Sequence, residues 1–434
     1  MARLGARIRK DTMETMKTLG TAAVARSPMS PGTNISKVSC VPGVLQPPTV
    51  GQGLKTTNGN MVRLGDVATY INGYAFKPAD WSTEGVLIIR IQDLTGNSYK
   101  ANRFKGKIDK RYEVLNGDVL ISWSASLGVY VWSGEKAVLN QHIFKVQFDK
   151  TQVNKSFFVH QVECILKRAI GEAHGATMKH LTKPAFDALP FYLPDIQKQK
   201  AIADSLDKIS HLITLRKQQL SKLDELVKSQ FVEMFGDVVA NDRRWPMAKF
   251  GDVTDSRLGK MLDAKKQTGR NTHKYLANFN VQWFRIDDSE LHEMDFDAAD
   301  QIEFELKEGD LLVCEGGESG RCCVWRGQIR DCYYQKALHR VRCNPERLNP
   351  DFLAYWFWMN CHHGAFEHII GAKATIAHLP GVKLKKLDVI LPPLALQREF
   401  AAFVAKVDKL AFKAKASLEK LETLKKAMMQ KYFN

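Results

Sequence analysis

The chain has 434 residues, of which 44% are hydrophobic and 25% charged, as in a folded, water-soluble protein of two or three domains. No apolar run approaches the roughly 18 residues of a membrane span, so we expect no contact with a membrane. The net charge of +16 favours a polyanionic partner such as nucleic acid, although charge also serves solubility alone. The excess is uneven, because residues 61–194 carry 17 Lys and Arg against 12 acids and residues 237–392 carry 22 against 23.

The eight cysteines form no CxxC pair and match no common zinc-site spacing. Cys361-His362-His363 is the nearest approach to a ligand cluster, and we expect no metal there. Free thiols in the cytoplasm are the better explanation, since nothing marks the chain as secreted.

Residues 1–60 contain no Phe, Tyr or Trp and are rich in small and polar residues. Such a segment buries too little apolar surface to fold alone. We therefore predict a disordered tail, or a stretch foreign to the natural protein, ahead of a folded part that begins near Met61.

From Met61 the pattern changes to short apolar runs between turn residues, followed by one helix. The second half of the chain repeats this order. The strands expected in the first half are Val86–Ile91, Asp118–Ser122, Gly128–Trp132 and Ile143–Phe148, with a helix at Lys155–Ile170 and closure at Leu189–Pro194. Those expected in the second half are Val281–Ile286, Asp310–Cys314, Arg321–Trp325 and Ala337–Arg342, with a helix at Pro350–Asn360.

One long helix is expected after each globular module, at 198–235 and 396–433. Apolar residues recur alternately four and three apart, a spacing typical of a coiled-coil seam. We predict an antiparallel pair of helices, which also offers partner-binding surface. The seam residues are Ile202, Leu206, Ile209, Leu220 and Leu223 in the first helix, and Phe400, Val404, Val407, Leu418 and Leu421 in the second.

The chain contains a long internal repeat. Ala176-Thr177-Met178-Lys179-His180-Leu181 is answered by Ala374-Thr375-Ile376-Ala377-His378-Leu379, and the offset of 198 positions then holds to the end of the chain. Upstream, Gly65-Asp66-Val67 pairs with Gly251-Asp252-Val253. Repetition of a whole module plus a helix predicts a pseudo-two-fold molecule, and two similar modules suit a target in two parts.

The repeated layout resembles the specificity subunit of type I restriction-modification enzymes. The residues that carry the resemblance are Val62–Val67 at the start of the first module, Asn140-Gln141-His142-Ile143-Phe144 late in it, Ala176–Leu181, and Leu391–Glu399 at the second long helix. The second module departs by having Tyr334-Gln335-Lys336 where the first has Asn140-Gln141-His142.

The resemblance implies an α+β protein with two globular α/β target-recognition domains, at 61–194 and 237–392, separated by two long antiparallel coiled-coil helices at 195–236 and 393–434. It implies a non-catalytic subunit that binds double-stranded DNA, two methyltransferase subunits, and restriction subunits that are motors and nucleases. AdoMet, Mg and ATP are then expected on the partners, with no cofactor on this chain.

Two alternatives to this interpretation are an enzyme with its own site and a coiled-coil adaptor without DNA specificity. A methyltransferase acting on base amino groups needs a hydrogen-bonding side chain beside its Pro-Pro pair, whereas Pro392-Pro393 lies between leucines. Glu305-Leu306-Lys307, with Asp295 and Asp297 upstream, loosely imitates a metal-dependent nuclease site. The Gly-rich stretch 315–320 lacks a lysine and is typical of a turn.

Base edges are read by Arg, Lys, Asn and Gln, and phosphates by Ser, Thr and Lys. The loop-like candidates for DNA binding in the first module are Lys77, Arg90, Gln92, Ser124, Ser126 and Lys179. Those in the second module are Lys260, Arg285, Arg321, Lys336 and Lys373. Each residue alone also fits a solvated surface position, and no catalytic or metal-binding residue is assigned.

Overall fold

The computed structural model describes residues 59–97, 100–172, 182–263, 267–366 and 378–433. The expected tail at 1–60 lies almost entirely outside the described residues. The chain divides into two compact units, one of residues 1–217 and 416–434 and one of residues 218–415. We call these the first and second unit, and each contains half of both long helices.

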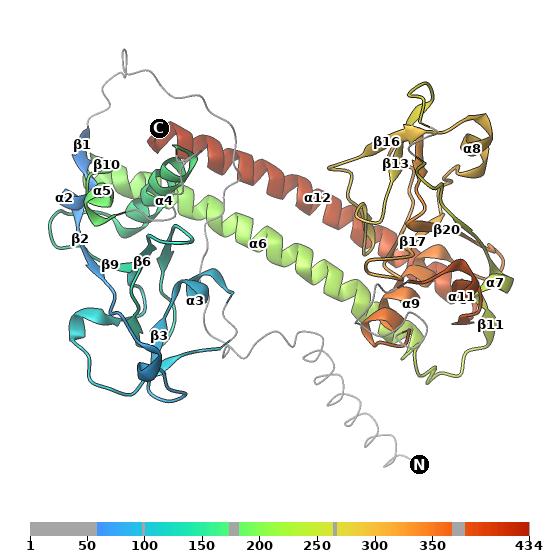
Figure 1. The fold of residues 1–434 in the computed structure, drawn as a ribbon, viewed down its shortest axis with the longest axis horizontal. Helices are drawn as coiled ribbons and strands as arrows, with labels where there is room; N and C mark the ends of the chain where they lie inside the picture. Colours follow the sequence, from blue (N-terminus) through green and yellow to red (C-terminus); the bar gives the residue numbers. More distant parts are fainter. Residues whose placement is uncertain (1–58, 98–99, 173–181, 264–266, 367–377, 434) are drawn as a thin grey trace. The chain divides into compact units, whose positions relative to one another are not determined.

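The first unit contains two four-stranded β-sheets (Figure 1). In the antiparallel sheet the strand order is β2 (Thr69–Asn72), β9 (Ile143–Gln147), β6 (Val119–Ser122) and β7 (Gly128–Val131). The other sheet has the order β4 (Arg103–Phe104), β3 (Val86–Ile89), β8 (Ala137–Leu139) and β5 (Glu113–Val114), with β3 and β8 parallel.

Strand β6 is buried on both faces. Val119 and Ile121 lie in a core that includes Phe157 and Phe158 of α4 (Lys155–Glu172), whereas Leu120 lies in a core with residues of β3 and β8. Successive side chains of a strand point to opposite faces, so a fully apolar strand suits a sheet covered on both sides.

The second unit repeats this arrangement. Its antiparallel sheet has the order β12 (Thr254–Leu258), β20 (Leu338–Cys343), β17 (Leu311–Cys314) and β18 (Cys322–Val324), packed by α9 (Pro350–His362). A second sheet has the order β16 (His292–Asp295), β13 (Thr272–Leu276) and β19 (Cys332–Tyr334), with β13 and β19 parallel. Leu311 and Val313 face one core and Leu312 and Cys314 the other, as in β6.

A two-stranded antiparallel pair closes each unit beside a long helix. These pairs are β1 (Gly59–Arg63) with β10 (Pro190–Pro194), and β11 (Met247–Lys249) with β21 (Asp388–Ile390). The short elements are α2 (Leu64–Val67), η1 (Pro78–Asp80), α3 (Ile91–Thr95), η2 (Lys110–Tyr112), α5 (Lys183–Asp187), α7 (Phe250–Val253), β14 (Val281–Gln282), β15 (Arg285–Ile286), α8 (Ala298–Glu303) and α11 (Gly381–Lys385).

Two of the predicted strands are wrong in extent. Strand β3 ends at Ile89, because Asp93 accepts hydrogen bonds from the Arg90 backbone amide and guanidinium and so starts helix α3. The run Val281–Ile286 is not one strand but the hairpin β14–β15, which turns at Phe284 in the left-handed region with φ of 62°. The other predicted strands are confirmed to within one residue at each end, and both module helices to within two.

The long helices are α6 (Ile196–Phe235) and α12 (Leu394–Phe433), each of 40 residues. Their antiparallel direction is visible within each unit. In the first unit the start of α6 shares a core with the end of α12, through Ile202, Leu206 and Phe433. In the second unit Phe231 near the end of α6 packs at 5.3 Å on Phe400 near the start of α12.

The predicted seam residues are most buried where the long helices meet the globular cores. Ile202, Leu206, Ile209, Phe400, Val404 and Val407 are buried, whereas Leu220, Leu223, Leu418 and Leu421 are only partly buried. Phe400, Val404 and Val407 also belong to the core under α9. These residues therefore join helix to module as well as helix to helix, which a heptad pattern alone does not reveal.

A buried glutamine joins each module to its helix. The Oε1 of Gln199 accepts from the Asn154 amide at 2.8 Å, and its Nε2 donates to the Pro194 carbonyl at 2.8 Å. Gln397 repeats both bonds at 2.8 Å with Asn349 and Pro392. Both side chains are at most 1% exposed.

Replacing Gln397 with leucine is expected to destabilise the second unit by roughly 2–5 kcal/mol, because buried backbone groups each cost about 1–3 kcal/mol when left without partners. Gln397 also donates to Arg347 O at 3.1 Å, so Gln199→Leu should cost less. Urea denaturation of the full chain measures both. Gln218→Leu, at an exposed position of α6, is the matched control. Equal midpoints for Gln397→Leu and this control would contradict a structural role for the joint.

Candidate nucleic-acid interface

In each unit the chain leaves one sheet and crosses to the other. After β2, Gly73 leads to Tyr74, which forms a parallel bridge with Asn140. After β12, Gly259 leads to Lys260, which forms the same bridge with Gln335. We call residues 73–74 with 140–141, and residues 259–260 with 335–336, the two crossovers.

Both crossovers require glycine. A Cβ on Gly73 would lie 1.9 Å from the Asn140 carbonyl oxygen, and one on Gly259 would lie 2.4 Å from that of Gln335. The backbone bonds also match, because Gln141 N donates to Tyr74 O at 2.8 Å and Lys336 N donates to Lys260 O at 2.9 Å.

The crossovers correct the alignment of the two copies. The sequence alignment places Tyr334-Gln335-Lys336 against Asn140-Gln141-His142. In the structure, Gln335 makes the bridge that Asn140 makes in the first unit, so Asn140 and Gln335 are the equivalent residues. Gln141 accordingly corresponds to Lys336. The structural equivalence is therefore shifted by one residue from the sequence alignment, and Lys336 takes the place of a glutamine.

Aromatic and cationic side chains surround the first crossover. The Tyr74 side chain is 42% exposed, and its ring lies 5.0 Å from that of Phe76 and 5.6 Å from that of Tyr112. The Arg111 guanidinium lies 4.7 Å from the Tyr112 ring centroid. Exposed aromatic rings beside cations suit contacts with bases and phosphates. Arg111 and Tyr112 were missed by the sequence prediction, although they follow a run of lysines.

The predicted readers of the first unit have different surroundings. Arg90 is held in place, since its Nε lies 3.0 Å from Asp93 Oδ2 and its Nη2 donates to Lys100 O at 2.7 Å. Lys77 and Gln92 are exposed. Ser124 is buried, whereas Ser126 is exposed beyond Ala125, whose φ is 58°. Lys179 lies outside the described residues.

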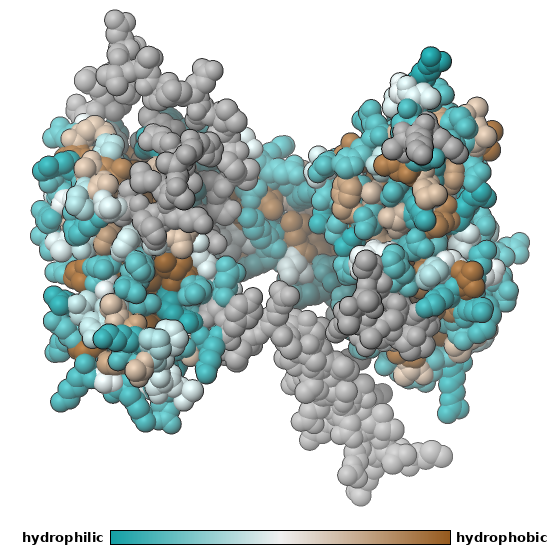
Figure 2. Space-filling view, viewed as in Figure 1, coloured by the Kyte–Doolittle hydropathy of each residue, from teal (hydrophilic) through white to brown (hydrophobic). Residues whose placement is uncertain are grey.

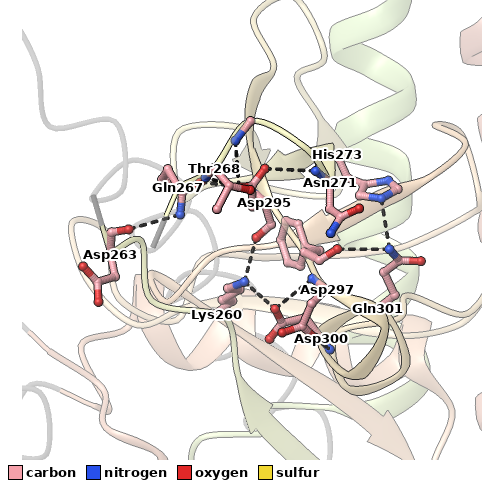
Figure 3. Close-up of polar contacts among 12 residues, drawn as sticks. Lys260, Asp263, Gln267, Thr268, Asn271, His273, Asp295, Asp297, Asp300 and Gln301 are labelled. Carbon is pink, nitrogen blue, oxygen red and sulfur yellow. Dashed lines mark hydrogen bonds and ion pairs between the residues drawn. The ribbon is translucent and has the colours of Figure 1, made fainter. Parts of the chain in front are cut away.

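Lys260, at the second crossover, is held by acidic residues (Figure 3). Its Nζ donates to the Asp295 carbonyl at 2.6 Å and forms an ion pair with Asp300. Its ammonium also lies 5.1 Å from the Phe296 ring centroid. The side chain is 20% exposed, so the charge is largely neutralised and the residue positions the crossover.

The Asp295 carboxylate organises the loop after Lys260 (Figure 3). It accepts from Thr268 Oγ1 at 2.8 Å, Gly269 N at 2.9 Å and Asn271 N at 3.3 Å. The Thr268 backbone amide also donates to this carboxylate. That bond contributes most to lowering the pKa of Asp295, and the other bonds add to the effect. Asp295, which belongs to the nuclease-like sequence pattern, therefore fixes the backbone of residues 268–271.

The other acids of the nuclease-like pattern also have structural partners. Asp297 caps α8, because its side chain accepts from the Asp300 amide at 2.9 Å. Glu305 and Lys307 form an exposed ion pair with 3.2 Å between Oε2 and Nζ. Within the described ranges, no group of three or more His, Cys, Asp and Glu residues is placed to hold a metal ion.

The remaining candidates of the second unit differ in availability. Arg321 donates to Glu318 at 3.0 Å and to Asn278 O at 2.8 Å, whereas Arg285 is exposed on the β14–β15 hairpin. Lys336 is exposed and borders a cavity of about 670 Å³ that Met261 and Phe304 also line. Lys373 lies outside the described residues.

The surface of both units is mainly hydrophilic on the face shown in Figure 2. No helix in the described part of the chain is long and apolar enough to cross a membrane. Burial raises the pKa of the Cys314 thiol to about 11 and of Cys332 to about 12, which keeps both thiols protonated near neutral pH. These two cysteines thus pack as small apolar residues.

The chain is similar in sequence to specificity subunits of type I restriction enzymes. The EcoBI specificity subunit of Escherichia coli is 29% identical over 181 residues, which cover 41% of this chain and 38% of that protein. The EcoKI specificity subunit of Escherichia coli K12 is 21% identical over 281 residues, covering 60% of each. The chain thus matches less than two thirds of the length of these two relatives.

Solved structures show a similar fold. The S subunit of a type I restriction-modification system from M. genitalium has a TM-score of 0.55 at 13% identity, covering 88% of this chain and 98% of that one. A chain from a study of type I R-M assembly has a TM-score of 0.52 at 15% identity, covering 88% and 99%.

The family model described as the type I restriction modification DNA specificity domain matches residues 58–225 and 243–423. Those two matches begin and end near the boundaries of the two repeated copies and take in both crossovers and most of both long helices. The chain belongs to the family of type I restriction-modification DNA specificity proteins.

Proposed function

We propose that the chain is the DNA-recognition subunit of a type I restriction-modification complex, reading a two-part target without catalysing a reaction. One observation carries the proposal. The same scaffold is built twice, with matching joints at Gln199 and Gln397, while the crossovers carry different side chains, Tyr74 and Gln141 against Lys260 and Lys336. A shared frame whose crossovers carry different side chains suits two half-sites of different sequence.

The structure favours some reading residues over others. Arg90, Lys260 and Arg321 are paired with neighbouring acids, so we assign them positioning roles. The proposed contacts of the first unit are Tyr74, Lys77, Gln92, Ser126 and Gln141, and those of the second are Met261, Arg270, Arg285 and Lys336. Ser124, Lys179 and Lys373 remain candidates from the sequence.

Catalysis is assigned to partner subunits in the cytoplasm, which would bring AdoMet, Mg and ATP. Calorimetric titration of the purified chain with AdoMet tests this assignment, and tight binding would favour the self-contained enzyme. Binding of the chain to duplexes of unrelated sequence tests the adaptor alternative, which predicts equal affinity for all of them.

Repeated exposed leucines support two methyltransferase partners. Leu212 and Leu424 in the first unit are 45% and 48% exposed, and their equivalents Leu410 and Leu226 in the second are 53% and 47% exposed. Exposed apolar residues at equivalent positions of both copies suit two copies of one partner. The two leucine pairs are therefore proposed docking points, one partner to each.

The substitutions Leu212→Glu and Leu424→Glu together should remove one of two methyltransferase subunits, because charge in an apolar contact is costly to bury. Native mass spectrometry of the co-purified complex would then show one copy instead of two. Glutamates at His211 and Gln430, exposed on the same helices, provide the control. Loss of both copies, or of neither, would contradict independent docking points.

A further inference from the structure

The two units carry opposite charge on equivalent segments. Residues 100–112 of the first unit, which we call the basic strap, contain six Lys and Arg and one acid. Residues 292–308 of the second unit, the acidic strap, contain one Lys and seven acids. The segments correspond because β4 and β16 each pair antiparallel with the strand, β3 or β13, that also pairs parallel with β8 or β19.

The basic strap presents most of its charge to solvent, although Arg103 pairs with Glu135 at 2.6 Å and is 30% exposed. Lys107 and Lys110 are exposed, and neither has a side-chain partner among the described residues. Lys105 pairs at 2.6 Å with Glu84, where both side chains are 69% exposed, so that pair is weak and screened. Arg111 lies 3.4 Å from Asp109 and is also exposed.

Ring contacts hold the basic strap beside the first crossover. Phe104 of β4 lies 5.2 Å from Phe76, and Tyr112 of η2 lies 5.6 Å from Tyr74. The strap cations therefore lie on a segment that is anchored at both ends near the first crossover. A duplex whose base edges reach that crossover would bring its phosphates to the strap, since base contacts and phosphate contacts are made together.

The acidic strap has the opposite effect. Asp300 and Glu303 are used inside the unit, in ion pairs with Lys260 and Arg257. Glu293, Glu305 and Glu308 remain exposed. Carboxylates near a phosphate backbone repel it, so this segment offers no equivalent grip.

We propose that the basic strap is a phosphate-backbone grip of the first unit alone, so that the first half-site supplies most of the salt-dependent affinity. The second unit then holds its half-site mainly through base edges. This proposal rests on the proposed DNA-binding function. It adds that the two units contribute unequally to the salt-dependent part of the affinity. Removing one cation that neutralises a phosphate reduces the slope of log K against log salt by about 0.9 in magnitude.

The test compares the full chain with Lys107→Gln/Lys110→Gln/Arg111→Gln. The probe is a 40-base-pair duplex carrying the target mapped from methylated sites in cells that express the gene, and a second duplex with the target scrambled. We expect the magnitude of the salt slope to fall by about 2–3 on both duplexes. The ratio of the two affinities should stay within about twofold, because phosphate contacts carry no sequence information directly.

Two controls make the result specific. Lys107→Arg/Lys110→Arg should keep the wild-type slope, since charge is retained. Lys274→Gln/Arg330→Gln/Lys386→Gln, at exposed positions of the second unit that are not among its proposed DNA contacts, should change the slope by less than about 1. An unchanged slope in the strap variant, or an equal fall in the second-unit variant, would overturn the grip. Equal affinity of the wild type for both duplexes would instead refute the proposed recognition function.

Discussion

Replacing Phe400 with alanine is expected to lower the free energy of unfolding by about 3–5 kcal/mol, the usual cost of removing a buried phenyl ring. Phe400 is fully buried, and its ring lies 5.3 Å from Phe231, 5.6 Å from Phe235 and 5.1 Å from Tyr355. The substitution therefore opens a cavity where α6, α9 and α12 meet.

The matched control lies on the same helix. Phe412 is 76% exposed, so Phe412→Ala should change stability by less than about 0.5 kcal/mol. Urea denaturation followed by tryptophan fluorescence measures both variants. Similar midpoints for the two would mean that α12 does not close the core of the second unit.

Exchange of residues 59–194 for the equivalent module of a relative is expected to change one half of the recognised sequence completely and leave the other half unaltered. Each unit has its own cores, so the exchange leaves those of the second unit intact. The incoming module must keep the residues that contact the helices, chiefly Phe157, because that ring packs at 5.5 Å on Phe433.

Methylome sequencing of cells expressing the exchanged chain measures the outcome. The reciprocal exchange of the second module should alter only the other half. A change in both halves after a single exchange would show that the modules do not read independently. Loss of methylation with a folded chain would show instead that the incoming module does not pack correctly against α6 at Gln199.

The sequence predicted the repeat, the two long helices and three of the four strands in the antiparallel sheet of each unit, whereas it missed most strands of the other sheet in each unit. The predicted features leave a local signal, because apolar residues recur with the period of the helix or strand that buries them. It also identified Gln199 and Gln397 as equivalent, and both make the same two hydrogen bonds. The edges of elements were less accessible, as at Arg90, where one carboxylate three residues away decides between strand and helix.

Only the tertiary structure decided which cations are exposed and which are paired with acids. Lys260 is neutralised by Asp300, forty residues further along, and Arg340 is paired at 2.8 Å with Asp255 across two strands. Lys107 and Lys110 are exposed on a segment whose ends, Phe104 and Tyr112, contact Phe76 and Tyr74. Composition counts every charge equally, whereas pairing depends on which distant segments the sheets bring together. For that reason the repeat and the helices could be predicted from the sequence, whereas the division of the candidate cations into paired and exposed ones could not.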